Sequence, residues 1–244
     1  MNKIISIITI TITTLSSCSL QKGYVLLEQE MKNEKIGIDV VKNYIKINPR
    51  TSFVVTAPNS KEKSTESDRN AYIYNVIEKE LLQAGFDVKD RGLYNEVVSK
   101  SKDINYSDLK KLTGTDIILE LVKIDNDVTY YTNKWYKKSG IPMIYKYGEF
   151  VLKGSKIEFK FTLIDGNRYA GSYTFNYVPC KEKRNDCRCE VAYKNAPSKV
   201  YPLLSFCRGN TSDNSKAYEF VSKDEMEEFV KFNVRRMIDD IKGQ

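Results

Sequence analysis

The sequence predicts an α/β (α+β) protein, in which a mixed β-sheet is flanked by helices in a three-layer-like arrangement. Three observations predict it. Short apolar strands alternate with helical patterns over residues 49–122, apolar and polar residues alternate strictly over 157–163, and the C-terminal residues carry an apolar stripe at helical spacing. The 244 residues are 41% hydrophobic and 29% charged, a composition typical of a folded domain with its own core.

The first predicted elements are two strands with a helix between them. Ser52–Ala57 is a short apolar strand, ended by Pro58. A helix is expected from about Asp68 to Ala84, followed by Gly85 at the position that favours a left-handed residue. Its apolar residues recur three and four apart, at Ile73, Val76, Ile77 and Leu81. Phe86–Lys89 is predicted to form the next strand.

Two short helices and a buried strand follow. The first helix carries Leu93, Val97 and Val98, and the second carries Tyr106, Leu109 and Leu112. Gly114 ends the second helix. Thr115–Val122 is apolar on both faces, which is typical of a central strand covered on both sides.

A β-hairpin and a long helix close the predicted domain. Residues 157–163 and 169–177 alternate in polarity on either side of an Asp165–Asn167 turn. The C-terminal helix begins with a capping box, Ser222 with Glu225, and Val221 and Met226 occupy the positions of a hydrophobic staple. Its apolar stripe consists of Met226, Phe229, Val230, Val234, Met237, Ile238 and Ile241, and Gly243 follows it.

The first eighteen residues have the order of a targeting signal. Lys3 precedes an apolar run, Ile4–Leu15, which is too short to span a bilayer comfortably. The run ends in Leu-Ser-Ser-Cys, which resembles the bacterial lipoprotein lipobox. The resemblance implies a signal peptide over 1–17, cleavage before Cys18, a diacylglyceryl group on its thiol and a further acyl chain, such as palmitate, on its amine. A buried structural cysteine is the alternative.

The resemblance also predicts a location. Position 19 is Ser rather than Asp, and no acidic cluster follows Cys18. In lipoproteins of this kind these features imply sorting to the outer membrane, on its periplasmic face. Residues 18–48 are expected to form a lipid-anchored tether and N-terminal segment, and residues 49–244 the α/β domain.

The four other cysteines fall within a polar insertion at about 179–215. They are Cys180, Cys187, Cys189 and Cys207. An even, clustered set in an exported protein predicts two disulfides. Three connectivities are open, although the tight ring disfavours direct pairing of Cys187 with Cys189. Zinc ligation is the alternative, but paired C-x-x-C spacing is absent, so we expect no bound metal and no cofactor.

Several motifs together resemble a family of envelope lipoproteins. They are Gly85-Phe86-Asp87-Val88, Arg91 with Leu93, and Gly114-Thr115-Asp116 leading into a buried strand. This pattern resembles the curli-secretion-channel (CsgG-like) proteins, LpoB and the amino-terminal domain of TolB. The resemblance covers roughly residues 50–178 and the closing helix. It implies a protein of envelope assembly or secretion, and it raises the alternative of an oligomeric export pore.

Two departures weaken the pore alternative. Pore formation in that family needs two amphipathic hairpins, and the polar cysteine-rich insertion takes the place of the second. The first place, residues 125–155, is rich in Tyr and Lys and lacks clean apolar alternation.

One segment has the character of a binding surface. Residues 130–147 combine aromatic rings with lysines, a combination that suits a glycan or a protein partner. The aromatic residues are Tyr130, Tyr131, Trp135, Tyr136, Tyr145 and Tyr147, and the basic residues are Lys134, Lys137, Lys138 and Lys146. The alternative is a twisted hairpin with aromatic cross-strand pairs.

Catalytic patterns are weak. The chain contains no His, which excludes a Ser-His-Asp triad, and no phosphate-binding glycine motif. Asp125 and Asp127 suggest a calcium site or a carboxylate pair for hydrolysis, or simply a solvated strand end. Arg91 is expected to bridge Asp90, Asp116 or a backbone carbonyl, with anion or partner contact as the alternative.

These observations favour a non-enzymatic lipoprotein that binds envelope proteins, or peptidoglycan or another glycan. The alternatives are the oligomeric export pore and, after it, a carboxylate-based hydrolase. Net charge is +7, but acidic and basic residues are interspersed, so nucleic acid is not an expected partner. A homo-oligomer remains open.

Overall fold

The structure is a computed structural model. It describes residues 23–33, 35–57, 71–100, 106–137, 141–146, 148–179, 199–202, 221 and 223–243. The sites expected at Cys18, Cys180, Cys187, Cys189, Cys207 and Tyr147 lie outside these residues, as does Ser222 of the expected capping box.

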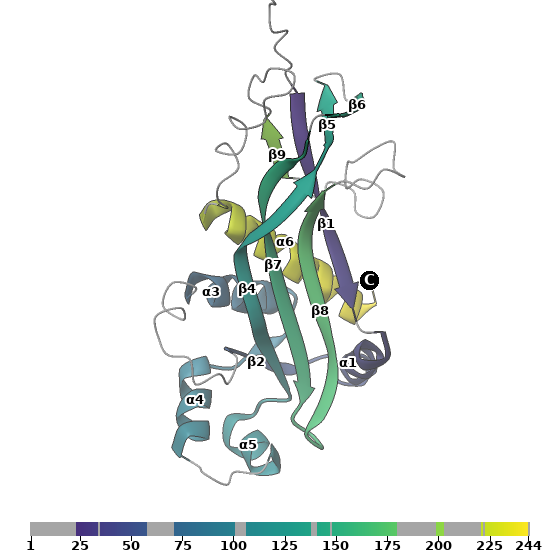
Figure 1. Cartoon of the computed structure of the whole chain (residues 1–244). Coiled ribbons are helices and arrows are strands. Elements are labelled where there is room, and N and C mark those ends of the chain that lie inside the picture. Colours follow the sequence, from purple (N-terminus) through teal and green to yellow (C-terminus); the bar gives the residue numbers. More distant parts are fainter. Residues whose placement is uncertain are drawn as a thin grey trace, which may run out of the picture.

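The described strands form one nine-stranded mixed sheet (Figure 1). The strands are β1 (Gly23–Asn33), β2 (Ser52–Thr56), β3 (Asp87–Val88), β4 (Ile117–Thr132), β5 (Lys134–Lys137), β6 (Pro142–Ile144), β7 (Phe150–Leu163), β8 (Arg168–Pro179) and β9 (Lys199–Pro202). Their order is β3-β2-β4-β7-β8-β1-β5-β6, and β9 pairs with β1. β3, β2 and β4 are parallel, and the pairs from β4 onward are antiparallel.

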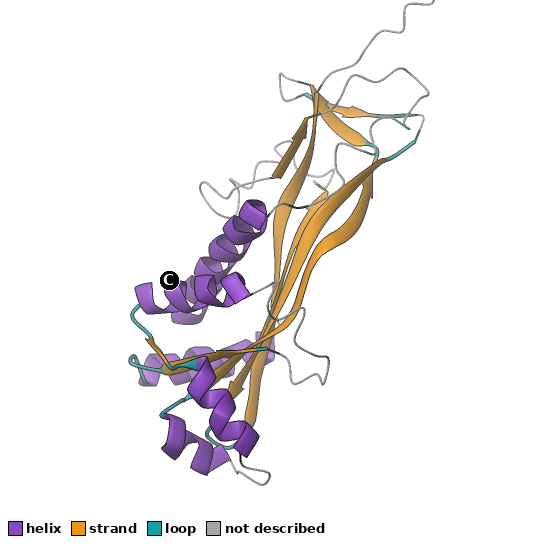
Figure 2. Cartoon of the chain, turned by 90° about the vertical axis from the view of Figure 1, so that its left-hand side faces the viewer, coloured by secondary structure: helices purple, strands orange, loops and turns teal. Residues whose placement is uncertain are grey.

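Helices cover both faces of the sheet, which confirms the predicted fold class. The helices are α1 (Lys35–Ile47), α3 (Ala71–Gln83), α4 (Arg91–Lys100), α5 (Tyr106–Thr113) and α6 (Lys223–Lys242). In Figure 2, α6 and α3 lie beside one face of the sheet. Phe53 and Val55 point to this face and join the main core with α1, α3 and α6. Val54 points the other way, because strand side chains alternate, and it packs with residues of α4 and α5.

The predicted hairpin is confirmed in detail. β7 and β8 pair antiparallel from Lys156↔Asn176 to Leu163↔Arg168. The turn uses two residues with positive φ, Gly166 at 73° and Asn167 at 48°, which are the residue types that tolerate that conformation. The inward rings of β7 and β8 fill the core, with Phe161 packed edge-on against Tyr173.

The N-terminal segment departs from expectation. Residues 23–33 form a strand within the sheet, and residues 35–47 form a helix that packs on it, so residues 23–47 belong to the folded domain that was expected to begin near residue 49. The physical reason is pairing with a distant partner: β1 runs antiparallel to β8 from Leu27↔Pro179 to Asn33↔Tyr173. β4 is also longer than expected and continues to Thr132 along β7.

The described part of the chain is elongated, with helices at one end and, among the described residues, only strands at the other (Figure 1). The strand end holds the beginning of β1, together with β5 and β6 (Figure 1). Only Asn133 separates β4 from β5, yet β7, β8 and β1 lie between these two strands in the sheet. One residue spans this gap only if the sheet curls strongly at this end. Among the described residues, no helix is long and apolar enough to cross a membrane.

Candidate functional site

The structure divides the expected aromatic binding surface into a buried part and an exposed part. Trp135, Tyr136 and Tyr145 are only 4%, 5% and 4% exposed, so the prediction of a binding surface is wrong for these three rings. The curl of the sheet explains their burial, because it folds β5 back beside β1 and encloses the rings. Tyr130 is half-buried, and Tyr131 is 60% exposed.

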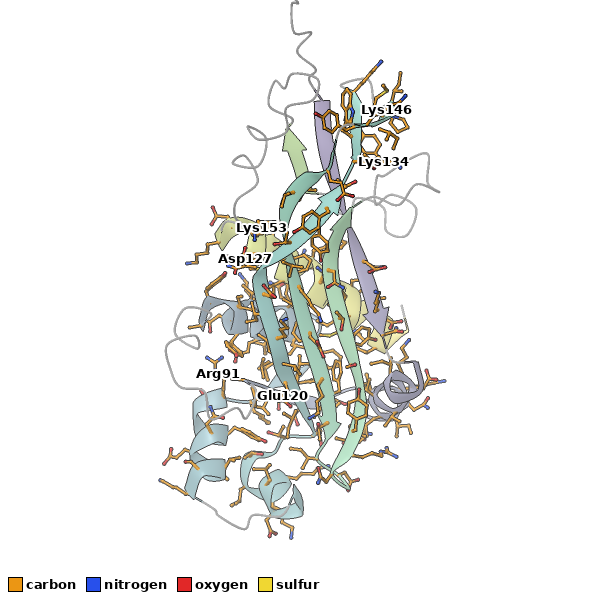
Figure 3. The ribbon with its side chains drawn as sticks, viewed as in Figure 1. Arg91, Glu120, Asp127, Lys134, Lys146 and Lys153 are labelled. Atoms are coloured by element: carbon orange, nitrogen blue, oxygen red, sulfur yellow. The ribbon has the colours of Figure 1, made fainter. Side chains whose placement is uncertain are left out.

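Two lysines in and near this region, Lys134 and Lys153, have partners; Lys137 and Lys146 are exposed, and Lys138 lies outside the described residues. Lys134 is buried, and its ammonium lies 5.7 Å from the centre of the Tyr136 ring. Lys153 Nζ lies 2.7 Å from Asp127 Oδ1 and donates to Thr129 Oγ1 at 2.8 Å. Figure 3 shows Asp127 and Lys153 together near the middle of the molecule, with Lys134 and Lys146 at the strand end. Lys153 of β7 is therefore bonded to Asp127 and Thr129 of β4 and joins these two strands.

Tyr130 is a weak acid in this setting. Burial, with smaller contributions from the carboxylates of Glu30 and Asp125, raises its pKa to about 12. Its hydroxyl therefore stays protonated at neutral pH and serves as a hydrogen-bonding group, not as a base.

Asp125 and Asp127 do not form a free carboxylate pair. Asp125 Oδ2 lies 3.3 Å from Lys123 Nζ, and Asp125 Oδ1 accepts a hydrogen bond from the Asp127 amide at 3.0 Å. The Asp127 side chain is exposed and is paired with Lys153. The register of β4 against β7 shifts between Asp125 and Val128, so the acids lie at an irregularity of the strand. No group of three metal-ligating side chains occurs within the described ranges.

Arg91 has a structural position at the first residue of α4. Its guanidinium lies over the Tyr74 ring, 4.3 Å from the centroid. Asp90, one of its expected partners, instead caps α4 by accepting a hydrogen bond from the Leu93 amide at 2.7 Å. Burial raises the pKa of the nearby Glu78 carboxyl, and attraction by Arg91 only partly opposes this effect. Arg91 thus fixes α4 against α3 instead of bridging to Asp116.

Asp116 is the centre of one network between elements. It accepts hydrogen bonds from the Tyr44 hydroxyl at 3.1 Å and from the Ser52 amide and hydroxyl at 3.0 and 2.8 Å. Lys110 Nζ lies 3.0 Å from its Oδ1. Burial by itself raises the pKa of Asp116, but the bonds from Ser52 and Lys110 hold it below its usual range. The ionised carboxylate ties α1, β2 and α5 to the start of β4.

Asp240 is the centre of a second network, at the end of α6. Its oxygens lie 2.7 Å from Lys42 Nζ, 2.5 Å from the Tyr173 hydroxyl and 3.2 Å from Asn33 Nδ2. Bonds from Lys42 and Tyr173 outweigh the effect of burial and hold the pKa of Asp240 below its usual range. Burial, followed by the hydrogen bond to Asp240, raises the pKa of Tyr173. Four elements, β1, α1, β8 and α6, meet at this carboxylate.

A third carboxylate, Glu80 of α3, is 5% exposed and forms a bidentate ion pair with Arg235 of α6. Its oxygens accept hydrogen bonds from Arg235 Nε at 2.6 Å and Nη2 at 3.1 Å. Sequence reasoning missed all three networks, because each joins residues that no local pattern connects. All three carboxylates hold helices in place.

A cavity of about 510 Å³ lies where the C-terminal ends of α1, α3 and α6 converge. It is lined by Lys42, Asn43, Ile45, Lys46, Pro49, Ala84, Phe86, Ile241, Lys242 and Gly243. Lys42 is bound to Asp240, and Lys242 donates to the Ala84 carbonyl at 3.1 Å. The partial negative charge of the helix C-termini opposes the positive charge of these lysines.

The described exposed side chains include an apolar pair that the search for aromatic residues missed. Ile141 precedes β6, Ile144 is its last residue, and the two side chains are 53% and 46% exposed at the strand end. A search for aliphatic residues near Lys137 and Lys146 would have found them.

The fold and these contacts define an elongated α/β protein whose three networked carboxylates are structural. No family model and no curated protein matches the sequence. Among solved structures, the fold of this chain is similar to that of the PelC dodecamer from Paraburkholderia phytofirmans, with a TM-score of 0.30, 8% identity and coverage of 61% of this chain and 80% of that one. A dodecamer of a PelC variant with one substitution, from the same organism, gives a TM-score of 0.27, with 10% identity and coverage of 52% of this chain and 71% of that one.

A PDZ domain protein from Parabacteroides distasonis is also similar, with a TM-score of 0.30, 11% identity and coverage of 77% of this chain and 42% of that one. Likenesses at this level do not define a family, so the resemblance to the curli-secretion-channel family stays a prediction.

Proposed function

We propose that the protein is a non-enzymatic lipoprotein of the outer membrane, anchored through Cys18 on the periplasmic face, that binds envelope proteins or glycan. The observation that carries the proposal is the order of Lys3, the apolar run and Leu-Ser-Ser-Cys at the N-terminus. Two or more acyl chains suffice for stable anchoring, whereas one chain binds marginally.

The position of the start of β1 supports this proposal. β1 starts at Gly23, five residues after Cys18, and it starts at the strand end of the molecule (Figure 1). Five residues span at most about 18 Å. An anchor on Cys18 therefore keeps the strand end close to the bilayer and directs the helical end, with α4 and α5, away from it.

The arrangement suits a mechanism of tethering. A protein confined to a surface meets partners on that surface at a higher effective concentration than a diffusing one. The helical end presents Leu93 of α4 and Leu112 of α5 to solvent, and these two helices contact each other. Exposed leucines on adjacent helices offer apolar contact area to a partner.

Two features favour binding over the alternatives. The networked carboxylates of Glu80, Asp116 and Asp240 are engaged with cations or hydrogen-bond donors, which does not suit a general acid. A pore needs a lipid-facing apolar hairpin within 125–155, but Lys153 and its partner Asp127 lie on one face of this hairpin, and Leu152 on the other is buried in the core.

Replacing Cys18 by Ser tests the proposal. The wild-type chain is expected in the outer-membrane fraction and the Cys18→Ser chain in the soluble periplasm, because the thiol that carries the diacylglyceryl group is gone. Cys207→Ser is the matched control and is expected to stay with the membrane. Photo-crosslinkers at positions 93 and 112 are then expected to capture an envelope partner in intact cells.

A Cys18→Ser chain that stays membrane-bound would show that the anchor is assigned to the wrong residue. Turnover of a small molecule or a glycan by the purified chain would contradict a non-enzymatic role.

A further inference from the structure

We infer that the β5–β6 hairpin is a second membrane contact, which docks on the surface of a bilayer containing anionic phospholipid. The inference rests on the proposed function, because the anchor at Cys18 brings this end of the molecule to the membrane.

The hairpin presents apolar and basic groups together. Ile141 and Ile144 are exposed, and Pro142 between them is exposed as well. Lys137 and Lys146, both exposed, lie on either side of this apolar stretch. Aliphatic side chains flanked by lysines are the composition of elements that lie in a membrane interface, with the apolar groups in the headgroup region and the ammonium groups on anionic lipid.

Backbone pairing places the hairpin beside the start of the folded chain. Gly23, the first residue of β1, is the register partner of Lys137 at the end of β5. Cys18 is five residues earlier, so an acylated Cys18 lies no more than about 18 Å from Gly23 along the chain. Figure 3 shows Lys146 at this same end of the molecule. The position of the anchor therefore favours a bilayer over a protein partner as the occupant of this surface.

Backbone hydrogen bonds close the hairpin at both ends, and β5 pairs with β1. The Lys137 amide donates to the Ile141 carbonyl at 3.0 Å, and the Tyr145 amide donates to the Asn133 carbonyl at 2.6 Å. Trp135, opposite Met143 in the register, is buried in the curled end of the sheet. Ile141 and Ile144 thus belong to a hydrogen-bonded hairpin, so their contact with lipid orders little additional chain.

Two attachment points have a consequence for orientation. A single flexible anchor leaves the body free to tilt, whereas an anchor and a hairpin contact fix its long axis relative to the bilayer. The face of α4 and α5, at the opposite end (Figure 1), is then held away from the membrane, where a partner reaches it.

Vesicle flotation of the full-length chain without its acyl group tests the inference. The Cys18→Ser chain from the periplasmic fraction is mixed with phosphatidylethanolamine–phosphatidylglycerol vesicles or with neutral phosphatidylcholine vesicles. We expect it to float with the anionic vesicles and to be released by salt. Ile141→Asp with Ile144→Asp is expected to lower the bound fraction at least about fivefold, because the two aliphatic side chains that would enter the headgroup region become charged.

Matched variants keep the test independent of folding. Leu93→Asp with Leu112→Asp, at the opposite end, adds the same charges and is expected to leave flotation unchanged. Lys137→Glu with Lys146→Glu is expected to abolish the preference for anionic vesicles while leaving the apolar pair intact.

Equal flotation of the Ile141/Ile144 and Leu93/Leu112 variants, or no flotation of the Cys18→Ser chain, would overturn the inference. If the acylated wild-type chain still binds the same vesicles in that case, the proposed anchor stands. If the wild-type chain carries no acyl group, the proposed function fails, whatever the hairpin does.

Discussion

Gly171→Ala is expected to lower the free energy of unfolding by about 3–4 kcal/mol, one of the two largest effects anticipated for this chain. α1 and β8 cross at Gly37 and Gly171 with their backbones in direct contact. A Cβ on Gly171 would lie 2.6 Å from the Ile38 amide nitrogen and 2.8 Å from the Gly37 carbonyl carbon. Gly171 also has a φ of 98°, a conformation that residues with a Cβ rarely adopt.

Two control variants separate the causes. Gly37→Ala places a Cβ 2.5 Å from the Gly171 Cα, and Gly37 lies in a helix, where Ala is otherwise preferred by about 1 kcal/mol. We therefore expect a loss of about 2–3 kcal/mol from steric overlap alone. Gly166→Ala keeps the strain of positive φ but meets nothing within 4 Å, and is expected to cost about 1 kcal/mol.

Urea denaturation followed by circular dichroism measures all three variants. A stability of Gly37→Ala equal to or above that of the wild type would show that α1 does not lie directly on β8.

Asp240→Asn is expected to lower the free energy of unfolding by about 2–3 kcal/mol at neutral pH. The change removes the negative charge that Lys42 and the Tyr173 hydroxyl share. The Tyr173 ring is fully buried, so its hydroxyl has no water to replace a weakened acceptor. Asp127→Asn, at an exposed carboxylate paired with Lys153, is the matched control and is expected to cost no more than about 0.5 kcal/mol.

The networks of Asp240 and Asp116 predict how the free energy of unfolding depends on pH. Because the pKa values of Asp240 and Asp116 are held below their usual range, both carboxylates contribute stability above the pKa of the unfolded chain. This contribution is lost as the pH falls from about 4 through the folded pKa values. Asp240→Asn is expected to show a shallower loss on acidification than the wild type. An identical acid profile would mean that Asp240 is not ionised and bound in the folded protein.

The elements that the sequence predicted are those whose signal is local. Alternation in the β7–β8 hairpin and the stripe of α6 need only neighbouring residues to be recognised, and Gly85 and Gly243 end α3 and α6 with φ values of 87° and 72°. β1 was missed because a strand paired with β8, more than a hundred residues away, carries no such local signature.

The candidate site was predicted less well, for a related reason. Tyr and Trp have an apolar ring and a polar tip, so their composition fits a binding surface and a core equally. The curl that places β5 beside β1 decided the burial of Trp135 and Tyr136, and it depends on the path of the whole sheet. The Gly37–Gly171 contact and the Glu80–Arg235 ion pair likewise join residues that only the fold brings together.

The intact mass of the chain purified from membranes, with fragmentation of its N-terminal peptide, tests the central claim most directly. We expect a mature chain that begins at Cys18 and carries a diacylglyceryl group on its sulfur. A chain that still begins at Met1, or one with an unmodified Cys18, would contradict it.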